Sequence, residues 1–283
     1  MQKDLSLLFS VVKISLYWLY GVMKKPALPF SLQELEGYFG FSIQSMEEIT
    51  GGCSMSSVYR IQGDQTSILK LSHLDHQENL GQEAEVIRWL GDYTSVPEAL
   101  FYGQVAGYEL LHLSLIEGDC ASDLPDPRAV VRAYARGLKR LHSIPVGDCP
   151  FDGRLESRIS AARERVEKNL VDEADFDEER QGQSAIQVLT EVDRKYLDLE
   201  EDPVVCHGDY CLPNLILKQD YSFSGFIDLS RAGVSDRFQD LALAHRSILA
   251  NFGFEYSQMF FQEYGIKPDD SKIAFYCLLD ELF

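Results

Sequence analysis

The residues best suited to chemistry in this 283-residue chain lie in one segment of its second half. The segment HGDYCLPN carries Asp209 and, five residues later, Asn214, and the following segment GFID ends at Asp228. Phosphoryl transfer uses an acidic residue to orient the attacking hydroxyl, and an amide and a second carboxylate to hold Mg²⁺ on the phosphates of ATP. The pattern therefore predicts phosphoryl transfer, with Asp209 as the catalytic residue and Asn214 and Asp228 as magnesium ligands.

Each of these residues alone is better explained by a turn or a strand end, so the prediction depends on the full set in its strand–loop–strand context. His207 begins the segment, and it titrates near neutral pH, so a general base is one interpretation. Phosphoryl transfer depends on positioning more than on proton abstraction. We therefore favour a structural role in which His207 hydrogen-bonds to the backbone of the loop.

The first half of the chain supplies matching groups for a nucleotide. Lys70 lies in a predicted strand, where a lysine that binds phosphate is expected, and Glu83 on the following helix is placed to pair with it. A solvent-facing lysine and a solvated helix face are the plainer explanations for either residue alone. A Gly-rich turn at residues 51–57 offers backbone N–H groups to phosphates, although it lacks the GxGxxG spacing.

The elements that position these residues follow from hydrophobic periodicity. In the first half, alternating apolar residues between turns predict strands at residues 43–49, 57–61, 67–71, 99–105 and 108–116, with a helix at 77–90. In the second half, we expect helices at residues 127–142, at 154–170 and from 237 onward, with short strands at 204–207, 215–217 and 223–227. The pattern predicts an N-terminal α+β lobe and a mainly helical C-terminal lobe that meet near residue 117.

Composition narrows the class of protein. The 26 basic and 45 acidic residues give a net charge of −19, which disfavours a nucleic-acid binder and favours cationic partners. The six cysteines are scattered without a CxxC pair, so we expect no structural zinc and reduced thiols in the cytoplasm.

An apolar segment at residues 5–23 stands apart from the rest of the chain. Its length approaches that of a membrane helix, but Lys13 near its middle opposes insertion into a bilayer. A membrane anchor, an amphipathic helix packed on the body and a stretch upstream of a working start at Met23 remain as interpretations. We favour a segment that does not span the membrane.

Three segments closely resemble the bacterial aminoglycoside 3′-phosphotransferases, the kanamycin and neomycin kinases: HGDYCLPN, SGFIDLSRAGVSDRFQDLALA and the terminal KIAFYCLLDELF. The similarity also covers ITGGCSMSSVYRI, the LK strand, the DCPFD turn and the acidic run DEADFDEERQG, and it spans about residues 39–283. The acidic run and the LLDELF end are the features most specific to this family. The resemblance implies a two-lobed, protein-kinase-like α+β fold, with a small antiparallel β-sheet lobe that carries one key helix and a larger, mainly helical lobe.

The resemblance also implies roles for individual residues. Asp209 matches the catalytic aspartate that orients the sugar hydroxyl, and Asn214 and Asp228 match the magnesium ligands. Lys70 matches the lysine on the ATP phosphates, and Glu83 matches its helix partner. Three further positions match the nucleotide site of the family. Ser54 falls in the loop that closes over the nucleotide, and Ser114 and Ile116 match hinge positions whose backbone would meet adenine.

In the family, the aminoglycoside is held by acidic groups from several segments. The corresponding positions here, which include two arginines, are Asp175, Asp177, Glu178, Arg231, Arg246, Asp280, Glu281 and the carboxylate of Phe283. An aminoglycoside carries several ammonium groups and almost no apolar surface, so a site for it must supply carboxylates. A solvated loop remains the plainer explanation of the acidic run. A terminal phenylalanine packed in place would fix its own α-carboxylate as one more anion.

The leading hypothesis is an ATP-dependent kinase that phosphorylates the 3′-hydroxyl of aminoglycosides and so confers resistance. We expect an N-terminal extension at residues 1–38, a nucleotide-binding lobe at 39–116 and a catalytic, aminoglycoside-binding lobe at 117–283, with no obligate protein partner. A kinase of another hydroxylated molecule, such as a macrolide, choline or an amino sugar, is the alternative, and a non-catalytic, cation-binding pseudokinase is a third. Ser230 and Ser247 depart from the family pattern in ways that bear on substrate range.

Overall fold

The computed structural model describes residues 29–49, 56–76, 79–196 and 199–283. The chain divides into two units, residues 1–44 and 45–283. In the first unit, helix α2 (Leu32–Phe39) begins at Ser31, whose hydroxyl accepts a hydrogen bond from the Glu34 N–H while the Glu34 carboxylate accepts one from the Ser31 N–H. The helix ends at Gly40, which adopts the left-handed conformation with φ 76°.

Two predictions fall on residues that the structure does not describe. The apolar segment at residues 5–23 and Ser54 both lie outside the described residues. Among the helices that are described, none combines the length and the apolar character that crossing a bilayer requires. The cytoplasmic location stays a prediction from the sequence.

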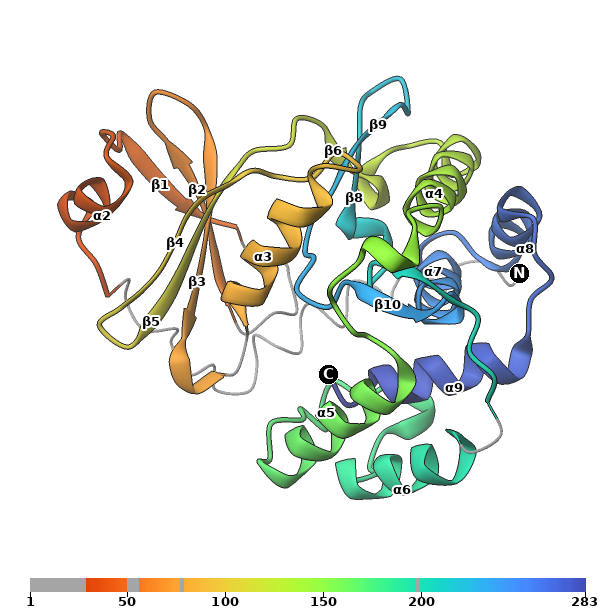
Figure 1. Cartoon of the computed structure of the whole chain (residues 1–283). Helices are drawn as coiled ribbons and strands as arrows, with labels where there is room; N and C mark the ends of the chain where they lie inside the picture. Colours follow the sequence, from red (N-terminus) through yellow and green to blue (C-terminus); the bar gives the residue numbers. More distant parts are fainter. Residues whose placement is uncertain (1–28, 50–55, 77–78, 197–198) are drawn as a thin grey trace, which may run out of the picture. The chain divides into compact units, whose positions relative to one another are not determined.

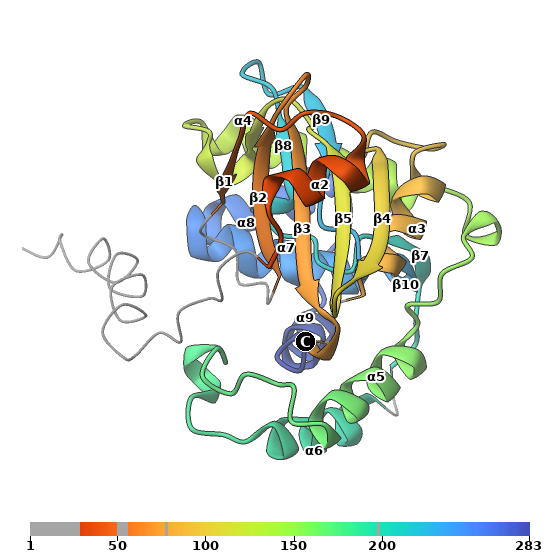
Figure 2. The same cartoon turned by 90° about the vertical axis from the view of Figure 1, so that its left-hand side faces the viewer.

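The second unit begins with an antiparallel five-stranded sheet, whose strands stand side by side in Figure 2. In spatial order the strands are β1 (Ser45–Glu48), β2 (Ser57–Gln62), β3 (Ser67–His73), β5 (Tyr108–Ser114) and β4 (Ala99–Val105). Helix α3 (Leu80–Leu90) packs against β4 and β5, and Asn79 caps its N-terminus by accepting a hydrogen bond from the Gln82 N–H. Sheet and helix thus share one apolar layer.

Strand β3 presents Lys70 because its residues alternate between the two faces of the sheet. Leu69 and Leu71 are buried in the core, whereas Lys70 lies between them on the opposite face. Antiparallel pairing fixes this register, since Lys70 lies opposite Val58 on β2 and Leu111 on β5. A shift of one residue would turn the lysine into the core.

Two small sheets in the C-terminal lobe flank the segment that carries Asp209. Strand β7 (Pro203–Cys206) pairs antiparallel with β10 (Gly233–Asp236). Strand β8 (Leu215–Leu217) lies between β6 (Asp119–Cys120) and β9 (Phe223–Phe226). The loop from β7 to β8 and the residues after β9 are therefore held at both ends by strand pairing.

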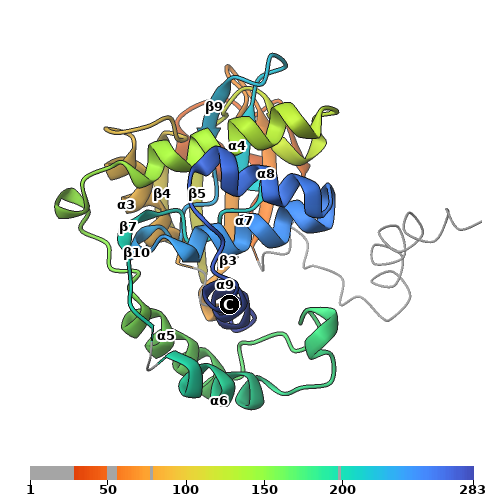
Figure 3. The ribbon, with the colours of Figure 1, turned by 90° about the vertical axis from the view of Figure 1, so that its right-hand side faces the viewer.

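Helices form the rest of this lobe: α4 (Pro127–His142), α5 (Leu155–Glu167), α6 (Ala185–Lys195), α7 (Phe238–Asn251), α8 (Phe254–Tyr264) and α9 (Asp270–Asp280). Helix α4 packs on α8, and α7 packs on α8 and α9, as Figure 3 shows. Helix α6 contacts both α5 and α9.

A reciprocal pair of tyrosines joins α4 to the loop after β7. Both side chains are fully buried and their rings stack with centroids 4.3 Å apart. The Tyr134 hydroxyl donates to the Tyr210 carbonyl at 2.6 Å, and the Tyr210 hydroxyl donates to the Tyr134 carbonyl at 2.8 Å. Each buried hydroxyl is thus satisfied, and the residue next to Asp209 is anchored to the core.

The predicted two-lobed α+β architecture is confirmed, and α4 has the bounds predicted for it. Helix α5 ends at Glu167, earlier than predicted, and Asn169 just beyond it adopts the left-handed conformation with φ 53°. The prediction from sequence missed α6, which begins just after the acidic run, although Ser184 and Gln187 form a capping box there. It also missed β10, a strand of four residues that is too short to show a period.

Candidate active site

The loop between β7 and β8 brings Asp209 and Asn214 into direct contact. A single 3₁₀ turn (Leu212–Asn214) folds the chain back, so that the Asn214 Nδ2 donates to the Asp209 carboxylate at 3.1 Å and to the Asp209 carbonyl at 2.9 Å. This bonding engages the amide nitrogen and turns the other amide atom, the acceptor Oδ1, away from Asp209. The predicted pair therefore shares one site.

Asp228 joins this pair from the end of β9. The N–H of the preceding residue, Ile227, donates to the Asn214 carbonyl at 3.1 Å. Asp228 itself adopts the left-handed conformation with φ 61°, which is uncommon for a residue other than glycine. Backbone strain of this kind persists where the surrounding structure fixes it, and it is frequent at functional sites. Its carboxylate remains 41% exposed.

Lys70 connects the sheet to Asp228. Its Nζ lies 2.7 Å from Glu83 Oε1 and 3.1 Å from Asp228 Oδ1, and the Glu83 side chain is only 1% exposed. Burial alone would lower the pKa of Lys70, but the two carboxylates outweigh burial and raise it, so the lysine is charged at neutral pH. Lys70 in turn lowers the pKa of Asp228. The predicted pairing of Lys70 with Glu83 is confirmed.

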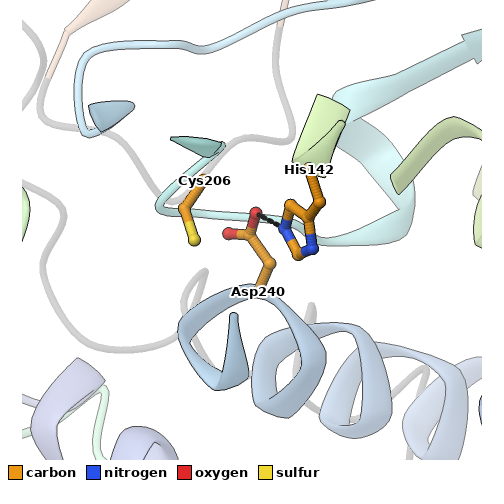
Figure 4. A group of neighbouring side chains, drawn as sticks. All are labelled: His142, Cys206 and Asp240. Carbon is orange, nitrogen blue, oxygen red and sulfur yellow. Dashed lines mark hydrogen bonds and ion pairs between the residues drawn. The ribbon is translucent and has the colours of Figure 1, made fainter. Parts of the chain in front are cut away.

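A buried carboxylate, Asp240 on α7, holds the backbone of the loop between β7 and β8, which carries Asp209 and is called the catalytic loop below. It accepts hydrogen bonds from the N–H groups of His207 at 2.7 Å and Gly208 at 2.8 Å. His142 bonds the same carboxylate at 3.0 Å through Nε2, as Figure 4 shows. The His207 Nε2 lies 3.0 Å from the Ile227 carbonyl, so the predicted structural role of His207 is confirmed.

His142, Asp240 and Cys206 form a cluster with the side-chain types that bind metals. Each group is nevertheless engaged within the protein. Both Asp240 oxygens accept hydrogen bonds, His142 Nδ1 bonds the Tyr264 hydroxyl at 2.7 Å, and the Cys206 thiol lies 3.4 Å from the Asp236 carbonyl. Burial raises the pKa of Cys206 well above its ordinary value, which disfavours the thiolate that a metal needs. We therefore interpret the cluster as a hydrogen-bonded scaffold.

Gly208 fits the loop against the segment that follows Asp228. Its φ is 85°, and a Cβ at this position would lie 2.1 Å from the Arg231 carbonyl oxygen. No side chain is compatible with that approach. The close contact fixes the spacing between the loop that carries Asp209 and the segment that carries Asp228.

Predicted substrate residues from four segments of the chain, one of them the segment that follows Asp228, form one ionic network. Arg231 donates to Asp280 at 3.0 Å. Arg246 pairs with the other oxygen of Asp280 and, at 3.4 Å, with Asp177. The Asp177 N–H donates to the Glu281 carboxylate at 3.0 Å. The acidic run, helix α7 and the C-terminal end of the chain therefore meet at this network.

The network lies close enough to Asp209 to act on it electrostatically. Burial raises the pKa of Asp209, and the nearby charges of Asp280 and Asp228 raise it further, while Arg231 opposes them. Burial also raises the pKa of Glu281 to about 7. The site thus gathers several carboxylates, the groups that form charge-assisted hydrogen bonds with a cationic ligand.

The remaining predicted residues lie at the edges of this arrangement. Asp175 and Glu178 are exposed on the same segment as Asp177, and no ion pair between described residues joins Glu178 to the network. The Ser114 N–H at the end of β5 donates to the Glu98 carbonyl at 2.9 Å. In the described part of the chain, nothing accepts a hydrogen bond from the Ile116 N–H.

Sequence reasoning missed several residues that position the site. Asp240 lies within the segment SDRFQDLALA, where the family resemblance gave this aspartate no role. Ser247 was noted only as a departure, yet its hydroxyl accepts a hydrogen bond from the Leu212 N–H at 3.0 Å and braces the catalytic loop. Neither role has a local signal, because both residues act on backbone groups more than 30 positions away.

Comparison with known proteins identifies what the chain resembles. A model of the phosphotransferase enzyme family matches residues 45–276. The chain is 32% identical over 262 residues to an aminoglycoside 3′-phosphotransferase of Niallia circulans, covering 90% of this chain and 97% of that relative. It superposes on the crystal structure of aminoglycoside-3′-phosphotransferase of type VIII with a TM-score of 0.76 and 33% identity, covering 84% of this chain and 94% of the other.

A second similar structure was solved with ADP and streptomycin bound. The aminoglycoside phosphotransferase APH(3″)-Id from Streptomyces rimosus, in complex with ADP and streptomycin, matches with a TM-score of 0.74 and 28% identity, over 89% of this chain and 96% of the other. That relative therefore binds a nucleotide and an aminoglycoside together on the same fold.

The close approach at Gly208 yields a prediction with a matched control. Gly208→Ala places a methyl group on the Arg231 carbonyl, so we expect the rate of phosphoryl transfer to fall about 100-fold or more, as for other misplaced catalytic groups. Gly182 also has a positive φ, 83°, but a Cβ at that position would have no atom within 4 Å, so Gly182→Ala incurs only the backbone strain. Steady-state kinetics on both variants tests this, and equal rates for the two would contradict the packing argument.

Proposed function

The chain belongs to the aminoglycoside 3′-phosphotransferases within the phosphotransferase enzyme family, which confer antibiotic resistance, and on this premise we propose roles for the residues of its site. Asp209 orients the attacking 3′-hydroxyl, while Asn214 and Asp228 hold Mg²⁺ on the phosphates of ATP. The observation that carries the proposal is that Arg231 connects the carboxylate network to the catalytic residue. It forms an ion pair with Asp280, and its charge acts on Asp209.

ATP is the proposed phosphoryl donor, consistent with the ADP bound by the Streptomyces rimosus relative. Lys70 contacts the phosphates, because it is charged and is held in place by two carboxylates. The Ile116 N–H, which has no acceptor among the described residues, and the backbone of Ser114 are the proposed contacts of adenine at the hinge. Ser54 is the proposed contact in the closing loop.

The donor set fits Mg²⁺, which prefers oxygen ligands and keeps several waters and phosphate oxygens around it. Asp228 supplies an ionised carboxylate, since Lys70 lowers its pKa. Asn214 supplies its amide oxygen, because Asp209 engages the amide nitrogen. When bound, the ion would neutralise charge that develops on the transferred phosphoryl group.

Asp209 acts mainly by position. Its carboxylate accepts a hydrogen bond from the substrate hydroxyl and holds the hydroxyl oxygen towards the terminal phosphate, and it receives the proton as the new bond forms. Asn214 fixes one carboxylate oxygen by donating to it at 3.1 Å. Burial raises the pKa of this carboxylate, and the charge of Arg231 opposes that shift.

The ammonium groups of the aminoglycoside bind to the carboxylate network in this proposal. Asp177, Asp280 and Glu281 form its centre, and the terminal carboxylate of Phe283 adds a further anion. Arg231 and Arg246 hold Asp280 in position with direct ion pairs, so this carboxylate is oriented before substrate arrives. Asp175 and Glu178 add negative charge at the exposed edge.

Replacing the catalytic carboxylate separates chemistry from nucleotide binding. For Asp209→Ala and Asp209→Asn, we expect turnover to fall about 10²- to 10⁴-fold or more because the hydroxyl loses its acceptor. The Kd for ADP, measured by calorimetry, should change by less than about threefold, since Lys70 and Asp228 are untouched. Asp75→Asn, at an aspartate that is 87% exposed, is the control and should retain full activity. Full turnover in either Asp209 variant removes this residue from the mechanism.

The raised pKa of Glu281 predicts a pH dependence of substrate capture. Because burial raises this pKa to about 7, the group is neutral below that pH and gains its charge as the pH rises through 7. At each pH, kcat/KM for an aminoglycoside is measured for the wild type and for Glu281→Gln. We expect the wild-type value divided by the variant value to increase about tenfold between pH 6 and pH 8.

Taking the ratio at each pH cancels the titration of the drug's own amines, which affects both proteins equally. A ratio that stays constant from pH 6 to pH 8 would show that Glu281 does not bind an ammonium group.

A further inference from the structure

We propose that Arg158, on helix α5, is a positioning residue for the aminoglycoside: its guanidinium lies against the ring of Phe283 and so fixes the terminal carboxylate beside Asp280 and Glu281. Arg158 itself need not touch the substrate. The inference rests on the proposed role of the terminal carboxylate in substrate binding.

Arg158 is a buried charge, and among the described residues no acceptor forms a hydrogen bond with its Nε or Nη2. It is 7% exposed, and its Nε and Nη2 are buried and unpaired. Burial lowers its pKa to about 10, so the guanidinium is still charged at neutral pH. An unpaired buried charge is destabilising, and an apolar side chain would avoid that cost. Asp280 attracts the guanidinium without forming an ion pair with it, and Arg231 repels it, so the buried N–H groups call for a further compensating interaction.

The ring of Phe283 provides that interaction. The Arg158 guanidinium carbon lies 4.7 Å from the ring centroid, within the range of a cation–π contact. Arg231 and Arg165 also approach the ring, at 5.4 and 5.8 Å, but each has a hydrogen-bonded partner. Arg231 pairs with Asp280, and Arg165 donates to the Leu282 carbonyl at 2.8 Å. Among the described residues, no hydrogen bond or ion pair engages Arg158 elsewhere.

Holding the ring holds the carboxylate, because both are attached to the same Cα. The Phe283 N–H donates to the Asp280 carbonyl at 3.1 Å, and Leu282 is fully buried, so the backbone is fixed up to the last residue. The ring contact then restricts the side chain of that residue. No ion pair to a described residue takes up the terminal carboxylate, which leaves it available to a cation.

The contact joins two segments that are far apart in the chain. In Figure 1 the C-terminus lies beside α5, and Arg158 lies in the first turns of that helix, well ahead of the acidic run. Helix α5 thus acts on the substrate site through the C-terminal residue, without contributing an acidic group. Loss of the guanidinium would remove the nearest of three cations around the ring and give the carboxylate more freedom to move, which weakens binding without affecting the phosphoryl-transfer residues.

Arg158→Met tests the proposal, because methionine is apolar and of similar length. We expect the KM for kanamycin to rise about tenfold, the order of a desolvated cation–π contact, while kcat and the KM for ATP stay within about twofold. The melting temperature should not fall, since the variant removes an unpaired buried charge. Arg158→Lys keeps a cation and should give an intermediate KM.

Arg163→Met is the matched control. Arg163 lies on the same helix, but its guanidinium is exposed and pairs with Asp193 at 2.6 Å. This variant should leave all kinetic constants unchanged. A purely structural role for Arg158 predicts a different result, in which the melting temperature and kcat of Arg158→Met fall together while the KM for kanamycin is unaltered. That result would overturn the proposal.

Two changes at Phe283 separate this inference from the proposed function. Phe283→Ala keeps the carboxylate but removes the ring, so it should raise the KM as Arg158→Met does, and the double variant should be no worse than the poorer single variant. Deleting Phe283 displaces the carboxylate itself. If the deletion raises the KM but Arg158→Met does not, the inference is wrong and the proposed function stands. If neither raises the KM, the carboxylate has no role in binding, and both fail.

Discussion

The ion pair between Lys70 and Asp228 is the contact on which the site depends. It joins the face of the five-stranded sheet to the end of β9, and Glu83 supports it from α3. Glu83 also accepts a hydrogen bond from the Leu229 N–H at 3.3 Å, so the helix is tied to the residue that follows Asp228. The group proposed to bind phosphate and the group proposed to bind magnesium are thereby held within 3.1 Å of each other before any nucleotide arrives.

A second set of contacts fixes the catalytic loop to the helical lobe. Asp240 accepts hydrogen bonds from two backbone N–H groups of the loop, and Ser247 accepts one from a third. Gly208, which has no side chain, permits close contact with the Arg231 backbone. Arg231 then extends the same rigid region to Asp280. The site is therefore preorganised from the proposed magnesium ligands to the carboxylates that we propose bind the aminoglycoside, which is the requirement for a reaction that proceeds by positioning and electrostatics.

The sequence predicted the parts of this site that carry local patterns. Asp209, Asn214 and Asp228 have the right types at close spacing, and Lys70 and Glu83 fall on a strand and a helix with clear periodicity. The residues that it missed act across long separations. Asp240 satisfies backbone groups, Ser247 does the same, and Arg158 contacts a ring 125 positions away. Such pairings depend on tertiary packing, which periodicity does not encode. Helix α6 was not predicted because the charged residues on its exposed face obscure the period of its few buried apolar residues.

The central claim is that Asp228 and Asn214 share one divalent ion beside Asp209. Crystals of the protein with ADP and Mn²⁺ in place of Mg²⁺ test it most directly, because anomalous scattering locates the manganese. The account predicts an ion within about 2.5 Å of an Asp228 carboxylate oxygen and of the Asn214 amide oxygen, with the remaining positions filled by phosphate and water. Manganese bound to ADP without either residue, or bound at His142 and Asp240 instead, would contradict it.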